Sequence, residues 1–318
     1  MFVQLVLLLL GFFLLIKGAG WLVDGAASLA VKYNVSKLII GLTIVAFGTS
    51  APELAINAIA SYQNHPEIVL GNIIGSNIFN LFLILGIAGL ITPLAVQSGT
   101  VWKEIPLSFV AVLMLFVLAN NFPVSEVRIL SRLDGLILVC MFALFLGYII
   151  RQLHRDIGNG IATIDAQSNF KLAALILIGL VVLVIGARLT INAAVRLATI
   201  LGVSEKIIGL TIVAAGTSLP ELATSVVAAI KKNNDIAIGN VIGSNIFNIC
   251  LILAVSVLIR PIVFDVRFNA DIGLLAGGTL FLFIAMFTGE KKSLDRWEAG
   301  ILLAAFAVYM GYLIAQAR

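Results

Sequence analysis

The sequence predicts an all-α integral membrane protein with ten transmembrane helices, arranged as two inverted five-helix repeats. Of its 318 residues, 61% are hydrophobic and only 11% are charged, and the mean hydropathy is +1.14. Soluble domains are about 45–50% apolar and about 25% charged, so this composition indicates a membrane protein. A spanning helix needs about 20 mostly apolar residues, and the chain contains roughly ten such runs. The runs are too long and too uniformly apolar for the alternating strands of a β-barrel.

A duplicated motif provides the second observation. Residues 41–55 read GLTIVAFGTSAPELA and residues 209–223 read GLTIVAAGTSLPELA. A second pair follows, GNIIGSNIFN from Gly71 and GNVIGSNIFN from Gly239, so the copies are 168 residues apart in both cases. Five spans per copy is an odd number, so the second copy must enter the membrane from the opposite side. We therefore expect two inverted units, at residues 1–153 and 171–318, joined by a linker at 154–170.

The first unit is expected to contain five spans, at about residues 2–29, 37–62, 68–92, 105–119 and 133–153. The first span is unusually long, which favours a tilted or peripheral helix. No basic segment precedes its apolar run, so we expect a retained span and not a cleaved signal peptide. Lys17 and Asp24 interrupt it, and of these only Asp24 is a possible neighbour of a functional site.

The second unit repeats this order after a polar stretch with the Gly, Asn and Asp content of a flexible linker. Its spans are expected at about 172–197, 205–230, 236–258, 270–287 and 297–315. Cys140 and Cys250 both fall within apolar runs. We interpret them as small buried hydrophobic residues, not as a disulfide or a metal site.

Lysine and arginine distribution predicts the orientation in the membrane. The loops after the odd-numbered spans hold eleven of these residues: Lys32, Lys37, Lys103, Arg151, Arg155, Lys171, Lys231, Lys232, Lys291, Lys292 and Arg296. The opposite face holds seven: Arg128, Arg132, Arg196, Lys206, Arg260, Arg267 and Arg318. The positive-inside rule therefore places the first set in the cytoplasm and both termini outside. The net charge of +4 is interpreted as this bias, and nucleic acid is not an expected partner.

Helix breaks are expected inside the repeated motifs. Gly48 weakens a helix and Pro52 removes a backbone hydrogen bond, which predicts a break near residues 46–51. Unwound backbone at membrane depth is tolerated only where it is buried in protein or lines a cavity. We expect the second and seventh spans to be discontinuous, and with them the third and eighth, which carry GSNIFN.

These segments supply a cluster of oxygen ligands with two buried carboxylates. Ser76 and Asn80 are four residues apart and share one helix face. The candidate ligands are Ala46 (carbonyl), Thr49, Ser50, Glu53, Ser76 and Asn80, and in the second unit Ala214 (carbonyl), Thr217, Ser218, Glu221, Ser244 and Asn248. A doubly anionic oxygen site suits Ca²⁺, which takes about 6–8 oxygen ligands, and Na⁺ is a hard cation of similar size. Without His or Cys ligands, zinc or copper chemistry is not expected.

Purely structural roles compete for some of these residues. Gly71, Gly75, Gly239 and Gly243 have the spacing of close helix packing. Asn80 and Asn248 could instead form hydrogen bonds between helices. Glu53 and Glu221 are different, because two buried carboxylates without a basic partner require a cation.

With GTSAPE, GTSLPE and two copies of GSNIFN, the chain resembles the cation/Ca²⁺ exchanger superfamily, most closely its prokaryotic sodium/calcium exchanger branch. The resemblance covers nearly the whole chain and places the family's ion-binding positions on the twelve residues named above. It implies an antiporter of the plasma membrane that works as a monomer without a cofactor. It also implies electrogenic exchange of three Na⁺ for one Ca²⁺, with the first and sixth spans sliding past the other eight. Asn248 stands where potassium-dependent relatives have Asp, which argues against K⁺ co-transport.

Other functions remain open from the residues alone. The nearest is a proton-coupled exchanger, or one of broader specificity for Mn²⁺ or Mg²⁺. A cation channel would use the same oxygens but has no need of two inverted halves. An intramembrane hydrolase is the weakest alternative, because the spans contain no His to act with a nucleophile.

Overall fold

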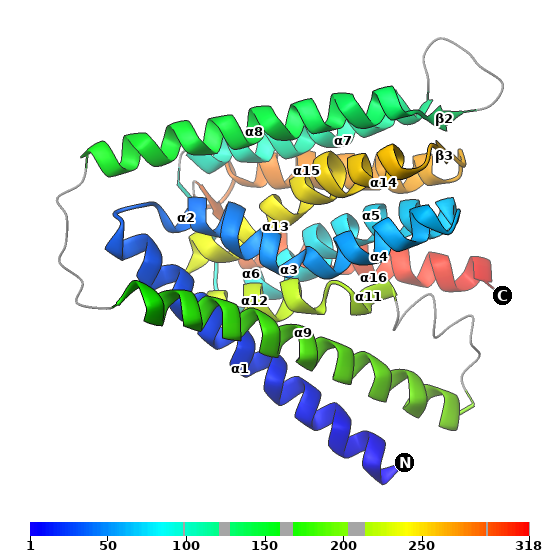
Figure 1. Cartoon of the computed structure of the whole chain (residues 1–318), viewed down its shortest axis with the longest axis horizontal. Helices are drawn as coiled ribbons and strands as arrows, with labels where there is room; N and C mark the ends of the chain where they lie inside the picture. The colour runs from blue at the N-terminus through cyan, green and yellow to red at the C-terminus, as the bar shows by residue number, and fades with distance from the viewer. Residues whose placement is uncertain (98, 121–127, 160–167, 203–213, 291, 318) are drawn as a thin grey trace.

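The computed structural model describes residues 1–97, 99–120, 128–159, 168–202, 214–290 and 292–317, and it is almost entirely helical (Figure 1). Within these residues, eight helices are long and apolar enough to cross a membrane. A ninth candidate is the pair Lys37–Thr49 and Ala51–Tyr62, which is bent by 47° at Ser50. The composition therefore correctly predicted a helical protein with many membrane spans.

The helices of the first half are α1 (Phe2–Lys32), α2 (Lys37–Ile40), η1 (Gly41–Val45), α3 (Ala46–Thr49), α4 (Ala51–Tyr62), α5 (Pro66–Ile78), η2 (Phe79–Ile84), α6 (Leu85–Ile91), η3 (Thr100–Glu104), α7 (Ile105–Asn120) and α8 (Arg132–Asn159). Those of the second half are α9 (Asn169–Ile200), α11 (Ala214–Gly216), α12 (Leu219–Ile230), α13 (Asn234–Phe247), η5 (Asn248–Leu253), α14 (Ala254–Ile259), α15 (Phe268–Ala285) and α16 (Arg296–Ala317). The η elements are π-helical segments. Between α4 and α12 the 168-residue offset holds at both ends.

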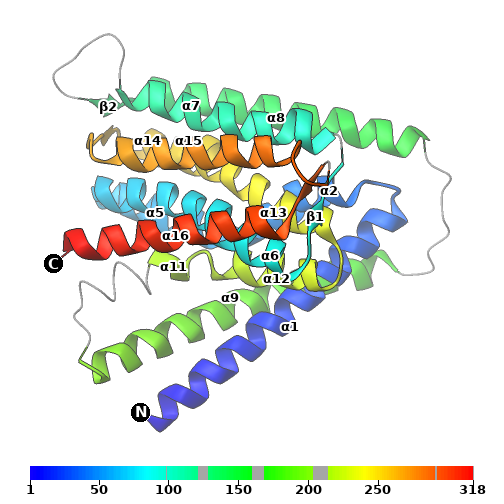
Figure 2. The ribbon, with the colours of Figure 1, turned by 180° about the vertical axis from the view of Figure 1, so that it is seen from behind.

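Helices α1 and α9 form an oblique pair along one side of the molecule, as both ribbon views show (Figures 1 and 2). Glycines let their backbones approach closely. A Cβ on Gly18 would lie 2.6 Å from the Leu183 nitrogen, and one on Gly179 would lie 2.7 Å from the Leu22 nitrogen. The expected peripheral placement of the long first span is confirmed.

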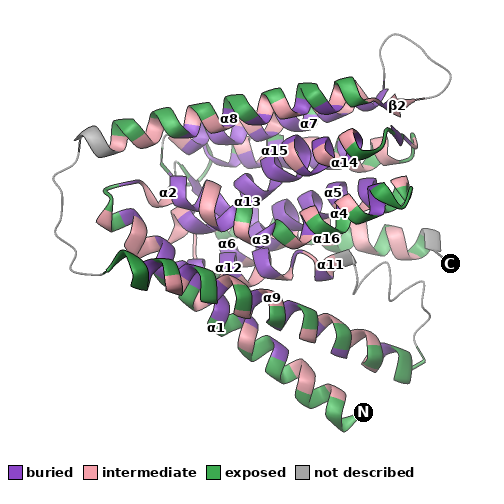
Figure 3. Ribbon diagram, viewed as in Figure 1, coloured by how far each residue is buried: buried purple, intermediate pink, exposed green. Residues whose placement is uncertain are grey.

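The centre of the molecule is formed by α5–α6 and α13–α14. In each of these spans 78% of the most apolar window is buried inside the protein, against 22% for α1, and Figure 3 shows the same contrast. Close packing explains two of the motif glycines, because a Cβ on Gly239 or Gly243 would lie within 3.0 Å of backbone atoms of residues 38–42. The central position of these helices places the GSNIFN motifs where they can reach each other.

Two short antiparallel strand pairs join the halves. Strand β1 (Leu94–Ala95) pairs with β4 (Ser293–Leu294), and β2 (Ile129–Leu130) pairs with β3 (Ile262–Val263). Each pair connects the residues after a central helix of one half to the residues before the last helix of the other. The all-α expectation missed these pairs, because two-residue strands leave no periodic pattern in a sequence.

Three details differ from expectation. The third and eighth spans are not broken, since α5–α6 and α13–α14 each run as one helix through a π-helical segment. The fourth span begins at Thr100, earlier than the expected residue 105. Cys140 is exposed on α8, whereas Cys250 is buried, because an apolar run does not distinguish a lipid-facing residue from a core residue.

Parts of the expected linker and seventh span, at 160–167 and 205–213, lie outside the described residues.

Candidate ion-binding site

The site is built around the helix breaks that precede α4 and α12. Ser50 (φ −85°, ψ 2°) and Ser218 (φ −90°, ψ 8°) leave helical geometry, and a proline follows two residues later in each copy. The break predicted near residues 46–51 is confirmed. Glu53 and Glu221 consequently lie in the first turns of α4 and α12, where the positive end of the helix dipole favours a carboxylate. Both are only 1% exposed.

A serine of each half donates a hydrogen bond to the glutamate of the other half. Ser50 Oγ donates to Glu221 Oε1 at 2.9 Å, and Ser218 Oγ donates to Glu53 Oε1 at 3.4 Å. The two bonds are related by the 168-residue offset. Glu53 and Glu221 therefore belong to one candidate site between the two halves.

A second reciprocal pair of contacts joins the threonines to asparagines of the opposite motif. Asn72 Nδ2 donates to Thr217 Oγ1 at 3.1 Å, and Thr49 Oγ1 lies 3.1 Å from Asn240 Oδ1. Asn57 supports this layer by donating to Asn72 Oδ1 at 2.7 Å. The threonine side chains are thus held toward the interface of the halves.

The GSNIFN motifs meet through four asparagines. Asn80 Nδ2 donates to Asn245 Oδ1 at 3.1 Å, and Asn248 Nδ2 donates to Asn77 Oδ1 at 2.9 Å. Asn77 and Asn245 also donate to each other's backbone carbonyls at 3.4 Å. Asn80 and Asn248 thus do form hydrogen bonds between helices, but only through their Nδ2 atoms. Their Oδ1 atoms stay free to act as ligands.

Several oxygens at this interface are buried without a hydrogen-bond partner in the described part of the chain. Five of them are Glu53 Oε2, Glu221 Oε2, Ser76 Oγ, Asn80 Oδ1 and Asn248 Oδ1, and Asn57 Oδ1 is orphaned as well. Leaving a buried polar group unsatisfied costs about 1–3 kcal/mol, and more for a charged one. All five atoms belong to residues that the sequence predicted as ligands. Buried oxygen acceptors of this kind are the ligands that a hard cation requires.

The other predicted ligands are engaged within the protein. The Ala46 carbonyl oxygen accepts hydrogen bonds from Ser50 N at 3.0 Å and from Thr49 Oγ1 at 3.2 Å. A cation that binds this carbonyl would therefore have to displace the Thr49 hydroxyl from it. Ser244 Oγ lies 3.0 Å from Ser50 Oγ. Ala214 is the first residue of α11, next to residues outside the described range.

Sequence reasoning missed Asn57 and four asparagines of the repeated motifs: Asn72, Asn77, Asn240 and Asn245. The signal was present, because all four lie in the repeated motifs and Asn72 is four residues before Ser76. Side chains at that spacing share a helix face. Asparagines that share a helix face with a predicted ligand are therefore candidates for its hydrogen-bond partners.

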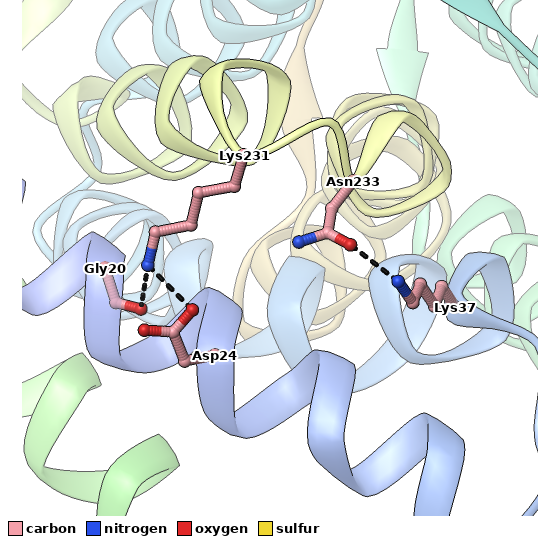
Figure 4. A network of polar contacts seen from close by, with 5 residues as sticks. All are labelled: Gly20, Asp24, Lys37, Lys231 and Asn233. Carbon is pink, nitrogen blue, oxygen red and sulfur yellow. Dashed lines mark hydrogen bonds and ion pairs between the residues drawn. The ribbon is translucent and has the colours of Figure 1, made fainter.

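Asp24 lies in a different environment from the one considered for it. Its Oδ1 forms an ion pair with Lys231 Nζ at 2.7 Å, and the same ammonium donates to the Gly20 carbonyl at 3.0 Å (Figure 4). Beside it, Lys37 Nζ donates to Asn233 Oδ1 at 2.7 Å. Asp24 therefore connects α1 to the end of α12 and is not a ligand of the central site.

Known proteins resemble this chain in both sequence and fold. The family model described as "Sodium/calcium exchanger protein" matches residues 3–151 and 171–315. The putative antiporter CaxA of Alkalimonas amylolytica is 36% identical over 99% of both chains. The sodium/calcium exchanger MaX1 of Methanosarcina acetivorans is 32% identical over 98% of this chain and 99% of its own.

A solved structure shows that the similarity extends to the fold. The sodium-calcium exchanger NCX_Mj, soaked with zero Na⁺ and Ca²⁺, superposes with a TM-score of 0.82 at 33% identity, covering 98% of each chain. Sequence motifs, buried carboxylates and three-dimensional structure thus lead to the same conclusion. The chain belongs to the sodium/calcium exchanger family.

Proposed function

We propose that this antiporter exchanges three Na⁺ for one Ca²⁺ at the site between Glu53 and Glu221. The exchange moves one net positive charge per cycle and is therefore electrogenic. Both carboxylates are shared by the competing ions. Hydroxyl, carbonyl and amide oxygens of the other ten predicted ligands complete the sites.

The single observation that carries this proposal is the set of orphaned buried oxygens around two carboxylates. Among the described residues, no lysine, arginine or histidine contacts either carboxylate. Two negative charges in a low-dielectric interior need compensation, and one divalent ion supplies it. Calcium takes about 6–8 oxygens, and the predicted set contains enough donors.

Ten helices in two inverted units, residues 1–153 and 171–318, form the proposed architecture, with 154–170 as the linker. The reciprocal bonds between Ser50 and Glu221 and between Ser218 and Glu53 support a two-fold relation. In this scheme α1 and α9 slide across the other eight helices and expose the site to one side at a time. The protein works as a monomer in the plasma membrane, with both termini outside.

A proton-coupled exchanger is the competing function, because buried carboxylates can also carry protons. The decisive experiment uses proteoliposomes loaded with Na⁺ and diluted into Na⁺-free buffer containing Ca²⁺. Vesicles without a Na⁺ gradient are the control. Ca²⁺ uptake that requires the gradient and responds to an imposed membrane potential supports the proposal. Uptake that follows a pH gradient and ignores Na⁺ would refute it.

A further inference from the structure

A long apolar groove lies on the outer side of the molecule between α7 and α8, far in sequence from the ion-site motifs. It has a volume of about 1130 Å³, slightly above the roughly 300–1,000 Å³ typical of ligand pockets. Its floor and walls are mainly aliphatic and sulfur-containing side chains, among them Leu107, Met114, Leu136, Cys140 and Leu144. In a chain that spans a membrane, this surface faces lipid.

The groove runs across the whole hydrocarbon layer. Its lining on α8 extends from Leu133 to Arg155, 22 residues or about 33 Å of helix at 1.5 Å per residue. The hydrocarbon core of a bilayer is about 30 Å thick. Half of the groove therefore matches the depth of one leaflet.

One end of the groove is basic. Lys103, Arg151 and Arg155 line it there, and Lys103 Nζ lies 5.5 Å from the centre of the Tyr148 ring. Arg151 and Arg155 follow Tyr148 at helical spacing, which places all three on one face of α8. Both arginines are exposed.

The carboxylates nearest this end are already engaged. Glu104 is buried and accepts a hydrogen bond from the Tyr148 hydroxyl, and Asp156 accepts from the Ser36 backbone nitrogen at 3.1 Å. Within the described residues, no ion pair neutralises Arg151 or Arg155. Three cations therefore face two hydrogen-bonded carboxylates, and this end of the groove carries a net positive charge.

Trp102 locates this basic end at the membrane surface. It is exposed at the start of the fourth span, next to Lys103, and packs against Phe283 and Phe287 with ring centres 5.9 and 5.3 Å away. Tryptophans are enriched where the hydrocarbon meets the headgroups. The three cations consequently lie at the level of lipid phosphates, and the aliphatic lining lies below them.

We propose that this groove is a binding site for one anionic phospholipid. Its phosphate is held by Arg151, Arg155 and Lys103, and an acyl chain lies along the aliphatic wall past Cys140. Basic pockets between transmembrane helices suit anionic headgroups, and arginine forms bidentate hydrogen bonds with phosphate. An apolar peptide helix would fill the groove but would leave these three cations without a partner.

Native mass spectrometry of the purified full chain tests this directly, by counting lipids bound during titration. The probes are dioleoylphosphatidylglycerol, dioleoylphosphatidylcholine with the same acyl chains, and glycerol 3-phosphate as a headgroup without chains. The variants are Arg151→Gln, Arg155→Gln and the groove-filling Cys140→Phe. Lys171→Gln is the matched control, because Lys171 is an exposed cation in the first turn of α9, away from the groove.

We expect one phosphatidylglycerol to bind more tightly than phosphatidylcholine, and glycerol 3-phosphate not to bind measurably. Loss of either arginine should weaken phosphatidylglycerol binding about fivefold, and Cys140→Phe should weaken both lipids. Equal binding of the two lipids, or an equal loss in Lys171→Gln, would overturn the headgroup assignment. Unchanged binding in Cys140→Phe would overturn the acyl-chain assignment. The thermal unfolding midpoint of each variant shows that a loss is not caused by misfolding.

Discussion

Replacing Gly18 with alanine tests how tightly α1 must pack against α9. The new Cβ would lie 2.6 Å from the Leu183 nitrogen and 2.8 Å from the Gly179 carbonyl oxygen. Favourable contacts of a carbon atom lie at about 3.5–4.0 Å, so the two backbones must separate by about 1 Å. Overpacking of this kind costs about 1–3 kcal/mol, and Gly18→Ala should be destabilised by that amount.

Gly20→Ala is the matched control on the same helix. A Cβ there meets only Lys231 Nζ, at an ordinary 3.6 Å. Alanine favours a helix over glycine by up to about 1 kcal/mol, so this variant should be as stable as the parent chain or slightly more so. Gly186→Ala is the repeat-related counterpart of Gly18→Ala, because Gly186 lies 168 residues after Gly18. A Cβ on Gly186 would lie 2.7 Å from the Leu15 nitrogen. This variant should show a similar loss.

The assay is the thermal unfolding midpoint of the detergent-purified protein, followed by Na⁺-driven Ca²⁺ uptake in proteoliposomes. Gly18→Ala and Gly186→Ala should unfold at lower temperature and transport more slowly than Gly20→Ala. If Gly18→Ala unfolds at the same temperature as Gly20→Ala, α1 and α9 do not approach as closely as described.

Three other predictions concern the site and the contact at Asp24. Glu53→Gln and Glu221→Gln should each fold but abolish Na⁺-driven Ca²⁺ uptake, because one negative charge cannot balance a divalent ion; full uptake in either variant contradicts a shared site. Asn72→Ala and Asn240→Ala should reduce apparent Ca²⁺ affinity by similar factors, since each contacts the threonine of the opposite half; a large effect in only one argues against equivalent roles. Lys231→Gln removes a partly exposed ion pair with Asp24 (side-chain exposure 34% and 55%). Solvent screening limits the free energy of this ion pair to less than about 1 kcal/mol, so uptake should change by less than about fivefold. A double-mutant cycle with Asp24→Asn should show a coupling energy between the two side chains, and this energy should decrease at high salt concentration.

The spans and the two halves of the site were predictable because each leaves a pattern in the sequence. Apolar runs of membrane length mark the spans, and the 168-residue repeat indicated that Glu53 and Glu221 are equivalent. The partners of Ser50 and Ser218 were not predictable, since a hydrogen bond to the carboxylate of the other half depends on tertiary packing. The ion pair of Asp24 with Lys231 was missed for the same reason, because 207 residues separate the two side chains.

The two motif types perturb their helices differently, and the difference follows from proline. GTSAPE and GTSLPE each contain a proline, which lacks a backbone donor and clashes with the preceding turn. Their helices break at Ser50 and Ser218. GSNIFN contains glycine and asparagine but no proline, so the helix continues and widens into π-helical segments that begin at Phe79 and Asn248.

Such π-helical segments shift the register of the side chains without ending the helix. In this protein they begin at or next to Asn80 and Asn248, whose Oδ1 atoms are buried without a hydrogen-bond partner in the described part of the chain. A full break there would have freed carbonyls from the two most buried spans, at a cost that the surrounding protein would have to offset. The widened turns instead bring side-chain oxygens to the site while every central helix stays continuous. At the proposed ion site, the broken helices and the continuous ones would together gather hard oxygens from four helices around two charges.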